Sequence, residues 1–88
     1  MAETNVPAVA RAFAILDLLA KEPGLSFTEL HTRLNLPKSS THHLVAGLID
    51  LGMLRQQDDG GFVLGLRLFE IAATATGHTL DDQAETVL

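Results

Sequence analysis

Residues 37–52 read PKSSTHHLVAGLIDLG, and this stretch decides how the chain folds. It opens with a proline, a lysine, three hydroxyl residues and two adjacent histidines, and then becomes almost wholly apolar. Proline favours the start of a helix, and a glycine after the last apolar residue favours its end. The pattern predicts one short helix that packs through its apolar side and leaves a polar front exposed to solvent.

A rotation of 100° per residue separates the two sides of this helix. The side predicted to face the core holds Thr41, Leu44, Val45, Leu48 and, at its margin, Leu51. The opposite side holds Ser39, His43, Ala46 and Asp50, with His42 on one flank and Ser40 and Gly47 on the other. Hydroxyl and imidazole groups are therefore concentrated on the outer face of the first two turns.

A second helix is predicted immediately before this one. Ser26-Phe27-Thr28-Glu29 fits the capping box, in which the serine oxygen and the glutamate side chain satisfy each other's backbone amides. This helix is expected to run to about Leu34, where Asn35-Leu36-Pro37 interrupts it. Two helices joined by about three residues are typical of a helix-turn-helix.

A β-hairpin is predicted directly after the helix-turn-helix. Residues 53–57 (MLRQQ) and 62–64 (FVL) flank Asp58-Asp59-Gly60-Gly61, and an Asp-Gly pair followed by glycine favours a tight turn. The predicted fold is therefore mainly helical α+β: a winged helix-turn-helix with a three-helix core and a two-stranded wing, followed by a linker helix.

The first and last helices carry more apolar residues than one core requires. Residues 6–20 place one stripe at Val6, Val9, Phe13, Leu16 and Ala20 and a second at Ala12, Ile15, Leu18 and Leu19, before a stop at Gly24. The helix predicted over residues 66–76 is apolar on several sides, and Thr79 is a candidate cap for one more. Helices of this kind usually have two partners. We expect a dimer interface that includes Ile15, Leu18, Leu68, Phe69 and Ala72.

Length and composition limit the function classes. The 88 residues, of which 47% are hydrophobic, suffice for one small domain and are few for an enzyme with its own substrate cavity. The absence of cysteine excludes disulfides and thiolate metal sites. Neither a secretory signal nor a membrane-spanning run is found, so the expected location is the cytoplasm.

The net charge of −5 argues against a nucleic-acid partner, but its distribution changes that conclusion. Between His31 and Arg55 the chain carries three cations against Asp50, together with three of its four histidines. Helix starts and short hydroxyls bind phosphate oxygens, and side chains on a helix front reach base edges. The predicted DNA contacts are Lys38, Ser39, Ser40, His42 and His43, with Arg33 and Arg55 as outlying phosphate contacts.

Four segments together resemble one family. Residues 9–16 (VARAFAIL), 24–26 (GLS), 36–40 (LPKSS) and 61–65 (GFVLG) are similar to the amino-terminal winged-helix domain of the IclR-type bacterial transcription regulators, over roughly residues 6–76. The resemblance implies a homodimer that reads a partly palindromic operator in double-stranded DNA. It also implies a small-molecule-sensing domain joined through the helix that starts at Leu66. We accordingly assign residues 1–65 to the DNA-binding domain and 66–88 to the linker helix and the start of an absent effector domain.

Two features depart from that family pattern. His43 stands where the family usually has arginine in its Lys-Ser-Thr-x-His-Arg segment, and Ser40 and Thr41 stand where threonine and an apolar residue are common. The wing tip, Asp58-Asp59, is acidic where a phosphate contact favours a cation. Weaker intrinsic binding or a different operator preference is expected.

Other functions agree less well with the sequence than DNA binding does. A winged-helix dimerisation or protein-interaction module, as found at the front of some methyltransferases, agrees with the acidic charge but not with the polar front of the third helix. A metal site is disfavoured because adjacent histidines on a helix point about 100° apart. Neither a glycine-rich phosphate loop nor a nucleophile-base pair is found, so we expect no enzyme activity and no cofactor.

Overall fold

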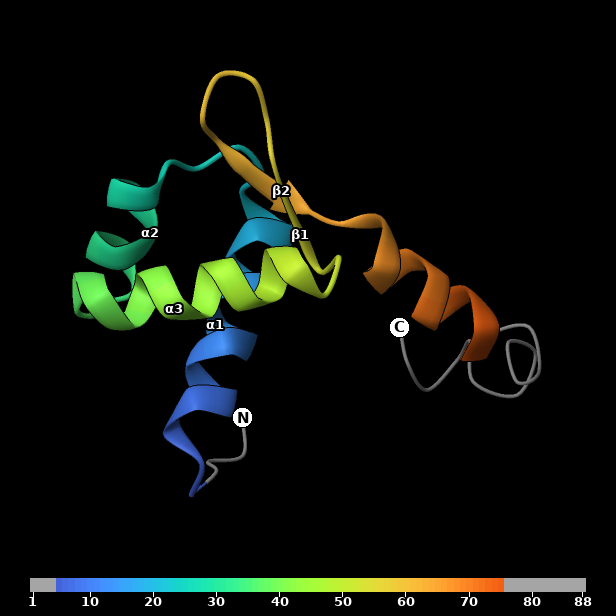
Figure 1. Ribbon diagram of the computed structural model, residues 1–88, viewed down its shortest axis with the longest axis horizontal. Coiled ribbons are helices and arrows are strands. Elements are labelled where there is room, and N and C mark those ends of the chain that lie inside the picture. Colours follow the sequence, from blue (N-terminus) through green and yellow to red (C-terminus); the bar gives the residue numbers. More distant parts are fainter. Residues whose placement is uncertain (1–4, 76–88) are drawn as a thin grey trace.

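A computed structural model describes residues 5–75 of the chain. Within this range three helices and a two-stranded antiparallel hairpin are followed by a further helix over residues 66–75 (Figure 1). The arrangement is the predicted winged helix-turn-helix. Among the described residues, no helix is both long and apolar enough to cross a bilayer.

Helix α1 spans Pro7–Lys21 and begins with proline in its first turn. Its inward residues are Ile15 and Leu19, which are 0% and 1% exposed. The stripe that points away from the core includes Val9 and Phe13, at 60% and 48% exposure. Of the two apolar stripes expected on this helix, the second therefore builds the core and the first is mostly exposed.

The burial of Ile15 corrects one residue of the predicted dimer interface. Its side chain is enclosed by the core of its own chain, so it has no surface to offer a second copy. Leu18 is also drawn toward this core and packs against it, although it stays partly exposed. The contact between chains, if built on α1, must use other residues of that helix.

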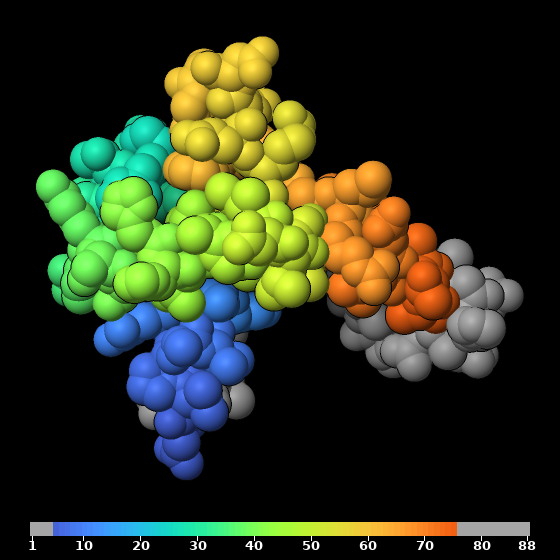
Figure 2. All heavy atoms as spheres, in the orientation of Figure 1, coloured from blue at the N-terminus to red at the C-terminus, as the bar shows by residue number. Residues whose placement is uncertain are grey.

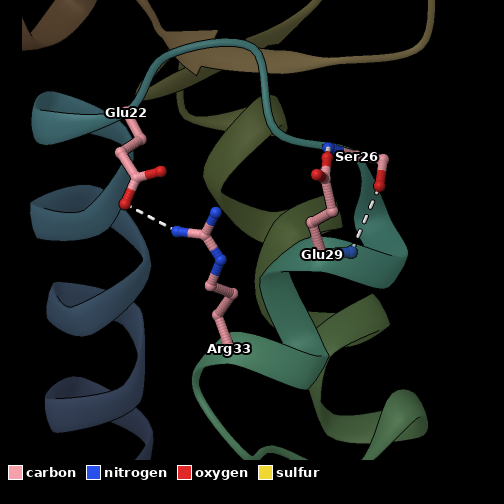
Figure 3. Close-up of polar contacts among 4 residues, drawn as sticks. All are labelled: Glu22, Ser26, Glu29 and Arg33. Carbon is pink, nitrogen blue, oxygen red and sulfur yellow. Dashed lines mark hydrogen bonds and ion pairs between the residues drawn. The ribbon is translucent and has the colours of Figure 1, made fainter.

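Helix α2 spans Phe27–Arg33 and starts with the predicted capping box. The Glu29 amide donates to Ser26 Oγ at 3.1 Å, and the Ser26 amide donates to Glu29 Oε1 at 2.9 Å (Figure 3). A helix of two turns gains little from propensity, so its stability depends on such caps and on the fully buried Leu30.

Helix α3 spans Lys38–Asp50 and follows a turn in which Asn35 adopts a φ of 55°. Pro37 is its N-cap residue, as the sequence predicts. Thr41, Val45 and Leu48 are buried, at 0%, 5% and 8% exposure, and Leu44 is partly buried, which confirms the predicted core side. The prediction was wrong for Leu51, the C-cap residue at the margin of that side, which is 67% exposed.

Strands β1 (Leu54–Gln56) and β2 (Phe62–Leu64) form the wing, with Arg55 opposite Val63. The connecting turn is closed by two hydrogen bonds: the Gly60 amide donates to the Gln57 carbonyl at 2.9 Å and the Gln57 amide to Gly61 at 2.7 Å. Gly60 has a φ of +92°, a conformation that a side chain disfavours. The predicted tight hairpin is confirmed.

A connection from the wing to the α1–α2 link was not predicted. The Phe62 amide donates to the Leu25 carbonyl, and the Gly24 amide donates to the Phe62 carbonyl, both at 2.8 Å. Gly61 makes this approach possible, because a Cβ there would overlap the Gly24 carbonyl. The hairpin is thus held to the helices by backbone bonds as well as by the buried Phe62.

The helix over residues 66–75 leaves the body beside the end of α3 (Figure 1). The Gly65 amide donates to the Met53 carbonyl at 2.7 Å and the Arg67 amide to the Gly52 carbonyl at 3.1 Å. Leu66, Phe69 and Ile71 stay largely exposed. The candidate cap at Thr79 lies outside the described residues.

We predict that Ser26→Ala lowers the free energy of unfolding by about 1 kcal/mol, because it leaves the Glu29 amide without its side-chain acceptor. Urea denaturation measures the change. Thr28→Ala is the matched control, since Thr28 is exposed on the same turn and no cap depends on it. Equal losses in the two variants would contradict a capping role for Ser26.

The capping box also makes stability depend on pH. Hydrogen bonds from the backbone and side chain of Ser26 lower the pKa of Glu29 below its ordinary 4.5. The stabilisation from the ionised carboxylate is therefore complete above pH 4.5 and is lost as the pH falls through the lowered pKa. Melting temperatures of the parent chain and Glu29→Gln should differ most near pH 6 and converge toward pH 3. If the difference in melting temperature stayed constant over this range, the ionised Glu29 carboxylate would not be the source of the stabilisation.

Candidate nucleic-acid interface

The exposed face of α3 is the most distinctive surface of the described chain. Ser39, His43, Ala46 and Asp50 are all exposed, opposite the buried Thr41, Val45 and Leu48. Figure 2 shows this helix across the front of the molecule, with the wing projecting beside it. The structure therefore places Ser39 and His43 in solvent, as the helical rotation predicts.

The start of α3 is suited to binding an anion. The amides of the first turn have no intrahelical acceptors, as in any helix. Pro37 provides no side-chain cap for them either, so they remain available to a ligand. These amides and the helix dipole place partial positive charge beside Lys38, Ser39 and Ser40, of which the first two are exposed. The buried Thr41 hydroxyl donates to the Pro37 carbonyl at 2.8 Å and fixes the first turn.

His42 lies differently from His43. Its ring packs against Phe27 of α2, with ring centroids 4.2 Å apart and planes tilted by 31°. Phe27 also contacts His31, at 5.3 Å between centroids, and the Nε2 atom of His31 is buried with no hydrogen-bond partner among the described residues. His42 remains exposed, and one face of its ring joins α2 to α3.

The cations fall into two groups. Arg33 Nη1 donates to Glu22 Oε2 at 2.6 Å, joining the ends of α1 and α2 (Figure 3), and the hydrogen bond and charge of Glu22 raise the pKa of Arg33. Lys21 and Arg67 are likewise paired with carboxylates. Within residues 5–75, Lys38 and Arg55 lie in no such pair. Of the three predicted phosphate cations, Arg33 is thus already engaged.

The acidic wing tip has a structural role. Asp59 Oδ1 accepts a hydrogen bond from the Gly61 amide at 2.9 Å, which stabilises the turn. Arg55 is exposed in the middle of β1, so it is the wing residue best placed to meet a phosphate. No cluster of His, Asp and Glu suited to a metal ion is found among the described residues.

A shallow groove between α3 and the wing was missed by the sequence analysis. It has a volume of about 240 Å³ and is lined by Phe27, His42, Val45, Ala46, Ile49, Gln56 and Phe62. Helical rotation places Ile49 and Ala46 on the same flank as His42, and this signal was present in the sequence. The contribution of Gln56 and Phe62 depends on how the wing packs, which no local pattern reports.

A helix-turn-helix packed on the core by its inner side, a polar exposed face on its second helix and an adjacent wing define a DNA-binding domain of the winged-helix class. The family comparison agrees: residues 8–58 match the model of the IclR helix-turn-helix domain. The chain therefore belongs to the IclR family, whose domain of this type binds DNA in transcription regulators, a non-enzymatic class. The predicted family, fold and absence of enzyme activity are confirmed.

Known proteins give the same result. The chain is 34% identical over 62 residues, or 70% of its length, to the transcriptional regulator KipR of Bacillus subtilis, and this match covers 25% of KipR. It is 36% identical to the solved Agobacterium tumefaciens repressor BlcR, with a TM-score of 0.77, covering 96% of this chain and 36% of BlcR. The chain thus spans about a quarter to a third of the length of these relatives.

The winged-helix fold also occurs outside regulators. The S-adenosylmethionine-dependent methyltransferase SibL matches with a TM-score of 0.63 and 28% identity, over 81% of this chain and 20% of SibL. This is a weaker likeness than that to BlcR in both respects. The match to the helix-turn-helix family model and the regulators among the curated relatives assign the chain to the DNA-binding class instead.

We predict that His43→Ala lowers the affinity for a cognate duplex about fivefold, the loss expected for one hydrogen bond, while the free energy of unfolding changes by less than about 0.5 kcal/mol. Val45→Ala is the comparison, because Val45 lies on the buried side of the same helix and its truncation should cost about 1–3 kcal/mol of stability. Binding titrations and urea denaturation separate the effects. A comparable stability loss in both variants would mean that His43 is not a surface residue.

Proposed function

We propose that this chain binds a specific sequence of double-stranded DNA by inserting the exposed face of α3 into the major groove. The observation that carries the proposal is the division of α3 into a buried side (Thr41, Val45, Leu48) and an exposed side (Ser39, His43). Ser39 and His43 supply hydrogen-bonding groups for base edges, and the small Ala46 allows close approach. His42, braced on Phe27, contributes to the border of this surface.

Phosphate contacts are proposed on both sides of that face. Lys38 and the first-turn amides of α3, with Ser39 and Ser40, bind one phosphate, and Arg55 of the wing binds another. This is supported by the absence of ion pairs at Lys38 and Arg55 within the described chain. Arg33 is less suited, because Glu22 competes for its guanidinium.

We infer that the domain acts as a homodimer on an inverted repeat. The support is apolar surface left exposed on two helices: Val9 and Phe13 on α1, and Leu66, Phe69 and Ile71 on residues 66–75. Leu68 and Ala72 lie on the latter helix, partly buried and exposed respectively. Association would remove this surface from water, and a two-fold dimer matches the symmetry of a palindromic operator.

The organisation of the whole protein is proposed from the lengths of its relatives. Residues 1–65 form the DNA-binding unit, and residues 66–88 supply a linker helix and the start of a carboxy-terminal domain that binds a small-molecule effector in the cytoplasm; of this second range the structure describes residues 66–75. KipR and BlcR each extend well beyond the region matched here, which leaves room for such a domain.

Selection of bound duplexes from a random pool tests the DNA-binding proposal. We expect recovery of an inverted repeat whose half-sites lie about one helical turn, or a multiple of it, apart. A pool that shows no enrichment would count against sequence-specific binding. Enrichment of a single, non-repeated site would keep the DNA function and reject the dimer.

The dimer itself is tested by Phe69→Asp, which places a charge on the exposed apolar surface of residues 66–75. We predict that this variant sediments as a monomer under conditions in which the parent chain sediments as a dimer, because the carboxylate would have to be buried in the interface. Thr28→Asp is the control for the added charge, since Thr28 is exposed on α2, which is not part of the proposed interface. A dimer that survives Phe69→Asp would exclude this interface.

A further inference from the structure

The groove between α3 and the wing has a composition unlike that of the chain as a whole. Its apolar lining consists of Phe27, Val45, Ala46, Ile49 and Phe62, and its polar side chains, His42 and Gln56, come from α3 and β1. None of its lining residues is acidic, although the chain carries a net charge of −5. An anion approaching this groove therefore meets apolar carbon and hydrogen-bond donors without a carboxylate in the wall.

The groove also borders the proposed DNA-reading face. Ala46 belongs to both surfaces, since it is exposed on α3 and lines the groove. A helix in the major groove is flanked on each side by a sugar-phosphate strand. The wing stands beside α3 (Figure 2), so the strand on that side would pass between the helix and the hairpin.

We propose that this groove holds one segment of the DNA backbone: a deoxyribose against Ile49 and Phe62, and the adjoining phosphate at the Gln56 amide and the His42 ring. The proposal rests on the DNA-binding function inferred above and adds a second phosphate site in the wing beside Arg55. The DNA backbone alternates a deoxyribose, whose C–H groups are apolar, with an anionic phosphate, which matches a mostly apolar lining that also holds hydrogen-bond donors. A base edge fits less well, because the groove spans two elements instead of the outward face of α3.

Gln56 is able to donate to a phosphate without unfolding the wing. Its Nε2 atom already donates one proton to the Gly60 carbonyl, at 3.2 Å, and a primary amide carries a second. The existing bond holds the amide at the end of β1, and the residue is exposed. Gln56 therefore acts as a neutral positioning donor in a sequence-independent contact.

The chain offers a matched control in the next residue. Gln57 has the same side chain and follows Gln56 directly, but it does not line the groove. Its Oε1 atom lies instead toward Gly24, 3.8 Å from the position a Cβ would take there. A charge placed at Gln57 changes the net charge of the protein equally while leaving the groove unchanged.

The test compares Gln56→Glu and Gln57→Glu by fluorescence anisotropy, using the selected operator duplex and an unrelated duplex of equal length. We expect Gln56→Glu to weaken binding to both duplexes by about fivefold to tenfold, because a carboxylate now faces a phosphate, and Gln57→Glu to change binding much less. Gln56→Glu also loses the hydrogen bond from Nε2 to the Gly60 carbonyl, so the melting temperature of each variant is measured as well, and affinities are compared at a temperature at which all the proteins are folded.

Gln56→Lys tests the same site by an expected gain in DNA affinity, which partial unfolding of the variant could not produce. It should strengthen binding to both duplexes and steepen the slope of log affinity against log salt concentration by about 0.9, the value for one added phosphate contact. Gln57→Lys should leave that slope close to the parent's.

Each remaining outcome is decisive. Equal effects at positions 56 and 57 would show only a general charge effect and would overturn the backbone site. An effect confined to the operator would mean that the groove reads a base, which also overturns it. If the parent chain binds neither duplex, the proposed function itself fails, and this inference fails with it.

Discussion

The burial of one side of α3 is the constraint on which the rest of this structure depends. Thr41, Val45 and Leu48 meet a core that includes Ile15 of α1 and Leu30 of α2, so the helix has a single rotational setting. That setting decides which residues face solvent. Since successive residues differ by 100°, a rotation of one position would turn His43 toward the core and bring a core residue to the surface. The face of α3 that we propose for DNA binding is therefore set by how the opposite side packs.

Local rules account for most of what could be predicted. The capping box at Ser26 and the hairpin turn at Gly60 depend on residues within four positions of one another, and both are present as expected. The facing of α3 follows from its own periodicity. These features need no knowledge of distant contacts, because each is stabilised by hydrogen bonds or burial along a single element.

The features that the sequence did not reveal share a different cause. Which apolar stripe of α1 faces inward depends on where α3 crosses it, and the sequence does not show that crossing. The sequence prediction therefore placed Ile15 in the dimer interface, whereas Ile15 is buried in the core. Arg33 meets Glu22 across eleven positions of sequence, and Gln56 meets α3 only through the fold of the wing. Long-range pairings such as these are specified by the sum of the core contacts, so no short window of sequence contains them. The dimer and DNA contacts themselves remain predictions.

An acidic chain that binds DNA must limit repulsion where the duplex approaches. Here three of the six cations are paired with carboxylates, and Asp59 is engaged in its own turn. Lys38 and Arg55 lie in no ion pair of the described residues, and no acidic residue lines the groove. Few phosphates can therefore be neutralised by each copy. Affinity would then come in larger part from hydrogen bonds and apolar contacts, which salt screens little, and from the doubling of contacts in the proposed dimer. A DNA-binding surface with so few free cations favours discrimination between sequences, because its non-specific attraction to any duplex is small.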